Sequence, residues 1–303
     1  MPDRQPPDAV RRLLDERSAA RESRDWARAD ALRDELATLG WEAQDGPSGS
    51  TARPILATEP TRSAIDDPPV VTASLQVVAE DHPGDLERFL RGLAAHPPTV
   101  ACELVVVANA PSFDVGPVLG GVELSMDSRV VAADERLGWA DARSLGLHQS
   151  RGEITVVLDT SLEPTGDFVT ALVAAFVDPS VGIAGGWGVT SDDARDFADA
   201  PPGEVDAVEG YCLAVRREAL RAVGGFDRRF RWYRNADLDF SFAVRDAGWR
   251  AVRTDPLPLL RHEHRGYASL DEGERERLSR RNFYRFLDHW RDRPDLLLSR
   301  RDR

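Results

Sequence analysis

The sequence contains no lysine, so all 39 of its basic residues are arginines. These face 52 acidic residues, and the formal net charge is -13. Binding to the phosphate backbone of a nucleic acid requires a basic surface, which this balance does not supply. We therefore expect no nucleic-acid partner.

Cysteine and long apolar runs are also scarce. With only Cys102 and Cys212, neither a disulfide framework nor a zinc site built from cysteines can form. The longest apolar run, residues 169–177, is far shorter than the roughly 20 residues that span a bilayer. The first residues lack the apolar core of a signal peptide. These absences predict a cytoplasmic protein.

What is present is an ordinary globular composition, with 42% hydrophobic residues over a length of 303. Residues 1–44 predict a helical hairpin, with helices over 9–23 and 26–39. Its expected N-caps are Asp8 and Asp25, its expected stop is Gly40, and its buried face carries Leu32, Leu36 and Leu39. Residues 45–70, rich in Pro, Gly and Ser, are typical of a linker.

From residue 71 to about 270, strand-like runs alternate with helical patterns. Expected strands are 70–78, 103–108, 128–132, 154–158 and 181–185; expected helices are 85–95, 140–150 and 168–176. The alternation predicts an α/β fold, with a mostly parallel sheet covered by helices on both faces. Ligands of such sheets bind beyond the carboxyl ends of the strands.

Acidic residues and histidines follow or lie near the predicted strand ends, where this fold binds its ligands. Asp159 follows the apolar run 154–158, where a carboxylate either holds a divalent metal or caps a turn. Asp237 lies at the start of a helical pattern. There it is either a general base or a negative charge that stabilises the helix start. His262 and His264 alternate along an extended segment, so both rings could face one pocket as metal ligands or lie on the surface.

Several motifs, in this order, resemble the family 2-type glycosyltransferases of the GT-A fold, in their rhamnosyltransferase-like branch. They lie between about residues 71 and 290: Val105–Ala110, Leu137–Ala140, Arg151–Glu153 before the strand ending in Asp159, Gly210–Arg217, Ala222–Asp227, Asp237–Asp239, Asp246–Trp249, His262 and Arg281–Phe286. The resemblance implies transfer of a sugar from a nucleotide-diphosphate donor to an acceptor hydroxyl, with inversion. The implied acceptor is a glycan or a lipid-linked molecule in glycan or cell-envelope biosynthesis.

The resemblance also implies roles for individual residues. Asp237 matches the catalytic base, and Asp159 matches the first carboxylate of an Asp-X-Asp motif that binds Mg²⁺ or Mn²⁺. His262 or His264 matches a histidine that completes the metal site. The residues implied in substrate binding are Asn109, at the nucleotide, with Gly138, Gly210, Arg217 and Asp239.

The chain departs from the family pattern at several positions. Ser161 replaces the second Asp of the metal motif, which weakens cation binding because fewer hard oxygen ligands remain. Glu163 or a water is a substitute ligand. The other departures are Ala108, Ala236, Arg143 and Ser144. They keep a second hypothesis open, a module that binds a nucleotide sugar or a glycan without turnover.

Residues 10–52 resemble the C-terminal segment of cysteinyl-tRNA synthetases, through Arg21–Leu36, Leu39-Gly40 and Asp45–Ser50. None of the catalytic signatures of the synthetase occurs, so aminoacylation is not implied. Seven arginines and nine acidic residues give this segment a formal net charge of -2, which argues against RNA binding. The expected role is contact with a protein partner or self-association; a translation-linked accessory protein is the alternative.

The C-terminal segment, residues 271–303, predicts a basic helical tail. Between 275 and 303 ten arginines face five acids. Its apolar stripe consists of Phe283, Phe286, Leu287 and Trp290. The stripe either packs on the core or makes peripheral contact with an anionic membrane, at the inner face of the cell membrane.

Overall fold

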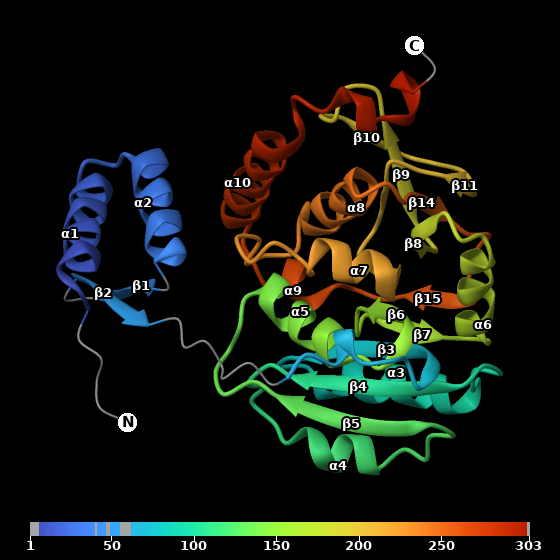
Figure 1. The fold of residues 1–303 in the computed structure, drawn as a ribbon. Coiled ribbons are helices and arrows are strands. Elements are labelled where there is room, and N and C mark those ends of the chain that lie inside the picture. The colour runs from blue at the N-terminus through green and yellow to red at the C-terminus, as the bar shows by residue number, and fades with distance from the viewer. Residues whose placement is uncertain (1–5, 40, 47–48, 55–61, 302–303) are drawn as a thin grey trace. The chain divides into compact units, whose positions relative to one another are not determined.

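The computed structural model describes residues 6–39, 41–46, 49–54 and 62–301. The chain divides into two compact units, Met1–Thr61 and Arg62–Arg303. Each unit has its own elements, and Figure 1 labels them.

The N-terminal unit pairs two helices with a β-hairpin (Figure 1). The helices are α1 (Asp8–Glu22) and α2 (Trp26–Thr38), as the sequence predicts. Asp25 caps α2, because its Oδ1 accepts the Arg28 N–H at 3.1 Å. The prediction that Asp8 caps α1 is wrong, since the helix begins after Pro7 and Asp8 lies in its first turn. Gly40 lies outside the described residues.

The β-hairpin completes the core of this unit. Strand β1 (Trp41–Gly46) pairs antiparallel with β2 (Gly49–Pro54), and Trp41 is buried with Leu14 and Leu36. Leu32 is also buried, whereas Leu39 is 53% exposed. The predicted linker is therefore too long, because β2 lies inside 45–70. Its Gly- and Ser-rich sequence is a strand here because it pairs with β1.

The second unit is built on an eight-stranded sheet in the order β11-β14-β8-β13-β6-β3-β4-β5. The strands are β3 (Val71–Ala79), β4 (Cys102–Ala108), β5 (Asp127–Ala132), β6 (Gly152–Leu158), β8 (Val181–Gly185), β11 (Gly203–Glu204), β13 (Cys212–Arg216) and β14 (Arg250–Arg253). The neighbours β6, β3, β4 and β5 are parallel, and β14 is parallel to β8. Strand β13 runs antiparallel to both β6 and β8.

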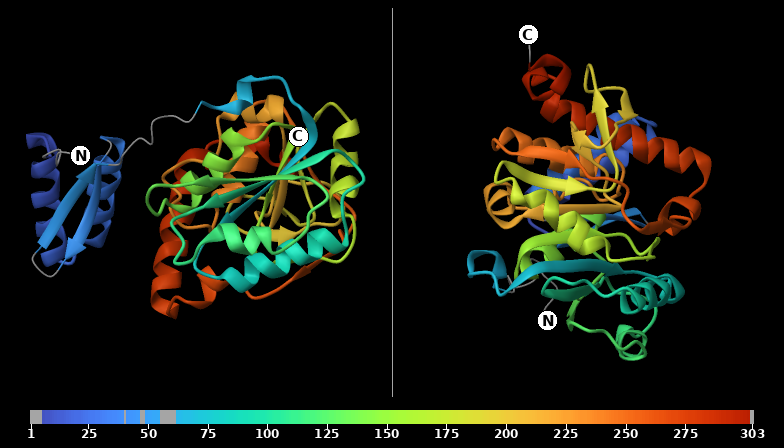
Figure 2. Two further views of the ribbon diagram at one scale, coloured as in Figure 1. Left: turned by 90° about the horizontal axis from the view of Figure 1, so that it is seen from below. Right: turned by 90° about the vertical axis from the view of Figure 1, so that its right-hand side faces the viewer.

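Helices cover both faces of this sheet, which confirms the predicted α/β architecture (Figures 1 and 2). The helices are α3 (Pro83–Ala95), α4 (Val115–Gly120), α5 (Trp139–Gln149), α6 (Phe168–Val173), α7 (Arg217–Val223), α8 (Ala236–Asp246), α9 (Arg265–Ala268) and α10 (Glu272–Trp290). One core contains Phe89 and Phe168 of α3 and α6. The other contains Leu147, Leu220 and Phe240 of α5, α7 and α8. Side chains alternate between the two cores along β6, where Val156 faces the first and Val157 the second.

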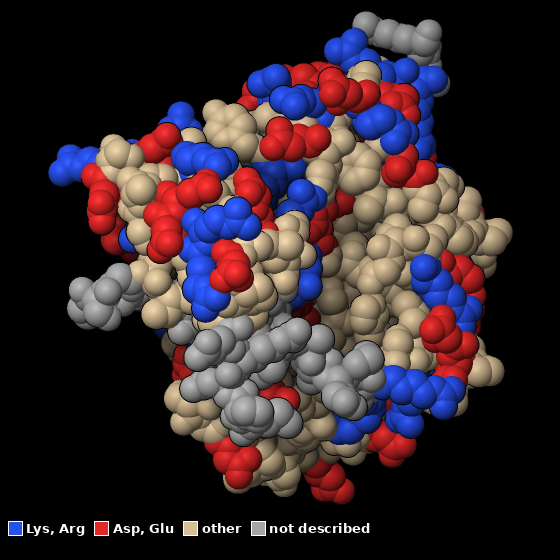
Figure 3. Space-filling model, turned by 60° about the vertical axis from the view of Figure 1, so that its left-hand side comes forward, with Lys and Arg blue, Asp and Glu red and all other residues tan. Residues whose placement is uncertain are grey.

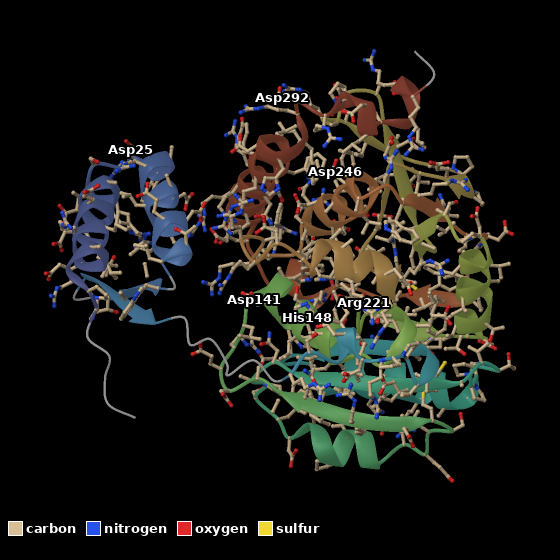
Figure 4. The ribbon with its side chains drawn as sticks, in the orientation of Figure 1. Asp25, Asp141, His148, Arg221, Asp246 and Asp292 are labelled. Carbon is tan, nitrogen blue, oxygen red and sulfur yellow. The ribbon has the colours of Figure 1, made fainter. Side chains whose placement is uncertain are left out.

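Short strands and 3-10 turns complete the fold. The strands are β7 (Leu162–Pro164), β9 (Gly188–Ser191), β10 (Phe197–Asp199), β12 (Ala207–Val208) and β15 (Leu259–Arg261). Helix α7 ends at Gly224, whose φ of 82° is left-handed, and the Gly224 carbonyl lies 2.6 Å from the His148 ring of α5 (Figure 4).

The C-terminal segment packs on the second core through its apolar stripe. Phe286 and Leu287 are buried, and Phe286 meets Phe242 of α8 edge-on at 5.0 Å. Beyond the helix, Arg293 pairs with Asp246 at the end of α8 (Figure 4). Phe283 and Trp290 are partly buried against the same core, so the stripe packs on the core and leaves part of these two rings exposed. On the face that Figure 3 shows, basic and acidic side chains are intermixed.

None of the helices within the described residues combines the length and the apolar character that a membrane span requires.

Candidate functional site

The carboxyl ends of β3 and β6 open onto two adjoining cavities, where this class of sheet binds its ligands. The larger, of about 620 Å³, is bordered by Trp139, Tyr211 and Tyr233. The smaller, of about 50 Å³, reaches the end of β3 at Val78 and Ala79. Asp159, Trp139 and His264 border both cavities, so the two form one continuous site.

The direction of β13 brings distant residues to this site. Because β13 is antiparallel to β6, Cys212 lies opposite Leu158. The residues before β13 therefore stand beside those that follow β6. The Asp159 N–H donates to the Tyr211 carbonyl at 3.0 Å. Glu209 and Gly210 border the larger cavity for the same reason.

Asp159 is a largely buried carboxylate, with 13% of its side chain exposed, and it is held by three donors. Its Oδ1 accepts the Ser161 N–H at 2.9 Å. Its Oδ2 lies 3.4 Å from both His264 Nε2 and Arg143 Nη2. Burial by itself would raise the pKa of Asp159, but hydrogen bonds and the neighbouring positive charges hold it well below its usual range. Asp159 is therefore ionised at neutral pH.

The two histidines separate, contrary to the prediction that both rings could share one pocket. His264 caps α9, since its Nδ1 accepts the Tyr267 N–H at 3.1 Å, which leaves Nε2 facing Asp159. His262 lies 2.6 Å from Glu163 instead. The extended segment ends with β15 at Arg261, so the alternation that the sequence suggested does not continue to the second histidine. Glu163 is likewise engaged away from Asp159.

Asp159 Oδ2 and His264 Nε2 could ligate one cation if the His264 proton moved to Nδ1, which would end the hydrogen bond from the Tyr267 N–H. Their separation of 3.4 Å is one that two ligands of a divalent cation can adopt. The hydroxyl of Ser161 is buried nearby without a hydrogen-bond partner within the described part of the chain. These groups fit a cation that is completed by ligands from a bound substrate.

A second group with metal-ligating atoms lies at α10. Atoms of Asp227, Asp239 and His289 lie within 4.8 Å of one another. Asp227 is bound by Arg229 at 2.7 Å, and Asp239 accepts the Trp290 indole N–H at 2.9 Å. His289 lies 2.8 Å from the same Asp239 oxygen. These contacts join α10 to α8 and to the Gly-Gly-Phe-Asp loop.

Asp237 lies in the first turn of α8, at the wall of the larger cavity. Its Oδ2 accepts the Gly210 N–H at 2.8 Å and its Oδ1 the Leu238 N–H at 3.0 Å. A Cβ at Gly210 would lie 3.3 Å from the Asp237 Cβ, so the glycine permits this close approach. Burial raises the pKa of Asp237, although the backbone donors oppose the rise. A raised pKa makes the carboxylate a stronger base.

Glu209 is a cavity residue that the sequence analysis missed. Burial, and then the charge of Asp237, raise the pKa of Glu209. Its position in the site depends on the antiparallel direction of β13, which the sequence pattern does not reveal.

Four residues expected at the substrate have structural roles here. Asn109 is fully buried; its side chain donates to Glu80 and Leu137 and accepts the Leu137 N–H at 2.7 Å. It therefore positions the loop before α5. Gly138 starts α5 where a Cβ would lie 3.2 Å from the Arg231 Cα, so it permits a backbone contact.

Arg217 and Asp239 are the other two. The Arg217 guanidinium donates to the carbonyls of Ala64, Asp67, Ser150 and Gly152, and neighbouring Arg221 donates to Ile65 (Figure 4). Asp239 is directed at α10, as described above. Of the five residues expected to bind substrate, Gly210 lines the larger cavity.

Comparisons with known proteins agree with this architecture. A model of glycosyl transferase family 2 matches residues 86–239, and a model of the cysteinyl-tRNA ligase anticodon binding domain matches residues 3–51. The pre-mycofactocin glycosyltransferase of Mycobacterium tuberculosis is 27% identical over 157 residues, which are 46% of this chain and 33% of the relative. The cysteine–tRNA ligase of Gluconobacter oxydans is 56% identical over 45 residues, 15% of this chain and 10% of the relative. The chain thus spans a third or less of the curated relatives.

Solved structures share the fold at low identity. A structure of GalNAc-T7 with UDP, GalNAc and Mn²⁺ has a TM-score of 0.60 at 15% identity, over 74% of this chain and 50% of that chain. The mannosyltransferase PcManGT from Pyrobaculum calidifontis, with GDP-Man and Mn²⁺, has a TM-score of 0.50 at 17% identity, over 81% and 66% of the two chains. The family model covers just over half of the sequence and includes the strand end at Asp159 and the helix start at Asp237, and the chain belongs to glycosyl transferase family 2.

Proposed function

We propose that this chain transfers a sugar from a nucleotide-diphosphate donor to an acceptor hydroxyl, with inversion at the anomeric carbon. The observation that supports the proposal is the pair of carboxylates in one continuous site. Asp159 is ionised where the small cavity meets the large one, and Asp237 has a raised pKa in the large one. Two carboxylates in such different surroundings suit two different roles.

The donor diphosphate lies at the small cavity in this proposal, and the acceptor occupies the large one. Asp237 takes the proton from the acceptor hydroxyl, whose oxygen forms a bond to the anomeric carbon. The bond from that carbon to the diphosphate breaks on the opposite side, and the nucleoside diphosphate leaves with the bonding electrons. Mg²⁺ or Mn²⁺ held by Asp159 and His264 would supply positive charge opposite the leaving diphosphate.

The larger cavity suits a glycan or lipid-linked acceptor. Its walls combine the aromatic rings of Trp139, Tyr211 and Tyr233 with acidic groups. A mixture of aromatic surface and a few polar groups is typical of sites that orient an organic ligand.

The direct test is a panel of nucleotide sugars in a thermal-shift assay, with and without Mn²⁺ or Mg²⁺. A ligand at 100 times its dissociation constant adds about 2.7 kcal/mol of stability. We expect one donor class to raise the melting temperature and to release nucleoside diphosphate in the presence of acceptor extracts. Binding without release in any extract would favour the second candidate, a nucleotide-sugar- or glycan-binding module, which the replacements at Ser161 and Ala236 suggest.

The N-terminal unit supports a separate proposal. Its match to the anticodon binding domain covers residues 3–51. We expect it to contact a protein partner or a second copy of the chain. Co-purification of tRNA would instead support the translation-linked role.

A further inference from the structure

Arg143 is a buried cation at the wall of the small cavity. It lies on α5, four residues after Trp139, and is 5% exposed. Its guanidinium carbon lies 4.0 Å from the centre of the Trp139 ring, a cation–π contact. The Arg143 backbone carbonyl accepts the Gln76 amide N–H at 3.0 Å, so the helix is also held against β3.

Most of the hydrogen-bonding capacity of this guanidinium is unused. Its Nη2 donates to Asp159 at 3.4 Å, a long contact. Its Nε and Nη1 are buried and have no hydrogen-bond partner among the described residues. Buried N–H groups of a cation are costly unless they are paired. The buried Arg217 shows the contrast, because its guanidinium donates to four backbone carbonyls.

The N–H groups of Arg143 that lack a partner in the described part of the chain require an acceptor, and an anion is the strongest one. The other arginine that borders the small cavity, Arg265, is already paired with Asp85 and Glu263. Burial lowers the pKa of the Arg143 guanidinium, and the charges of Asp159, Glu80 and Asp237 only partly oppose this shift. An arginine presents its N–H groups in a planar fork that matches two phosphate oxygens.

We infer that Arg143 binds the diphosphate of the donor, so that nucleotide binding persists when no divalent cation is present. This inference rests on the proposed function, because it assigns the small cavity to the donor diphosphate. Arg143 supplies a permanent charge at a site where Ser161 offers an uncharged hydroxyl. A cation at Asp159 and His264 then adds to binding but is not required for it.

The test measures binding of UDP, GDP, ADP and TDP by calorimetry, in EDTA and in Mn²⁺. We expect at least one of them to bind the unaltered chain in EDTA, within about tenfold of its affinity in Mn²⁺. Arg143→Gln should weaken binding in EDTA by at least about tenfold, since charge-assisted hydrogen bonds are lost. Arg143→Lys should bind nucleotide in EDTA with an affinity between those of the unaltered chain and Arg143→Gln. Lysine keeps the positive charge but lacks the planar pair of N–H donors.

The matched control is Arg91→Gln. Arg91 is an exposed arginine on α3 that pairs with Glu87 and does not border the small cavity, so the substitution removes one charge outside the site. We expect it to bind nucleotides as the unaltered chain does. Melting temperatures without ligand show whether each variant is folded.

Two results would overturn the inference while the proposed function stands. One is nucleotide binding by the unaltered chain in Mn²⁺ that disappears in EDTA, which requires no variant at all. The other is a folded Arg143→Gln variant that binds in EDTA as tightly as the unaltered chain. Absence of binding to all four nucleotides in both buffers would instead overturn the proposed function, and this inference with it.

Discussion

At the scale of single residues, the proposed chemistry of the site depends most on Asp237. Its carboxylate faces the large cavity, has a raised pKa and is oriented by two backbone N–H groups. Asp237→Asn should keep nucleotide binding and lower sugar transfer about 10²-fold or more. The amide keeps one oxygen, which can accept one of the two N–H groups, but it cannot take the proton of the acceptor. Release of nucleoside diphosphate with acceptor present measures the effect.

Glu163→Gln is the control for that substitution, since Glu163 contacts His262 away from the two proposed catalytic carboxylates. We expect its turnover to match that of the unaltered chain. Equal turnover in Asp237→Asn would place the base elsewhere.

A substitution at Asp159 separates the contribution of the metal to nucleotide affinity from nucleotide binding without metal. Asp159→Asn keeps an oxygen for the Ser161 N–H and removes the charged ligand. We expect the gain in nucleotide affinity from Mn²⁺ to vanish, while binding in EDTA is retained, since Arg143 remains. Calorimetry in the two buffers measures both values. A variant with the same response to Mn²⁺ would show that Asp159 is a turn residue.

The sequence located some of these residues and misassigned others, for a physical reason. Asp159 and Asp237 were predictable because strand ends and helix starts place side chains in open space. Asn109 and Arg217 were misassigned, since a polar residue in a matching motif can satisfy buried backbone groups as well as a ligand. Glu209 and Arg143 reach the site through tertiary packing, which neither their neighbours in sequence nor their residue type reveals.

At the scale of elements, a buried carboxylate joins the strands at the end of the sheet opposite the site. Glu103 of β4 is 1% exposed. Its oxygens accept the Ser74 hydroxyl at 2.6 Å and the Arg151 N–H at 2.7 Å, and they pair with the guanidinium of Arg151. Burial raises the pKa of Glu103, but these hydrogen bonds outweigh it and the net shift is downward. The charged form is therefore part of the folded state.

Glu103→Gln should destabilise the second unit by about 3 kcal/mol, because the buried group at this position loses the charge that pairs with the partly exposed Arg151. Since the folded pKa lies below the unfolded value of about 4.3, this contribution is present above that pH and is lost as the pH falls further. The variant should show a weaker loss of stability below pH 4.3 than the unaltered chain. Urea titrations at several pH values test both statements, with the exposed Glu153→Gln of β6 as the control. Identical pH profiles for Glu103→Gln and the unaltered chain would contradict the assignment.

The elements that the sequence predicted are those with a long, regular pattern. The strands over 71–79, 102–108 and 152–158 are buried nearly throughout, and most of their residues are apolar. Strands β11 and β12 have two residues each, too few for a pattern. The direction of β13 was not predictable either, because an antiparallel strand within a parallel sheet has no signature in its own residues.

At the scale of the whole molecule, the chain consists of two units with separate cores. Trp41, Leu14 and Leu36 belong to a core within the N-terminal unit, and the sheet cores belong to the second unit. The segment 62–67 belongs to the second unit, because Arg217 and Arg221 donate to the carbonyls of Ala64, Ile65 and Asp67. A domain boundary placed by composition alone cannot resolve this detail, since the segment resembles the rest of the linker.

Two truncations test this division. A chain beginning at Arg62 should keep the melting temperature and the nucleotide affinity of the second unit, because no core residue of that unit is removed. A chain beginning at Val71 should melt at a lower temperature, since buried Arg217 would lose two of its carbonyl partners. The full chain should show in addition a contact that the truncated chains lack, with a protein partner or a second subunit, measured by light scattering and cross-linking. If removal of residues 1–61 alone lowers the melting temperature strongly, the helical hairpin contributes to the stability of the second unit. The two units then do not fold independently of each other.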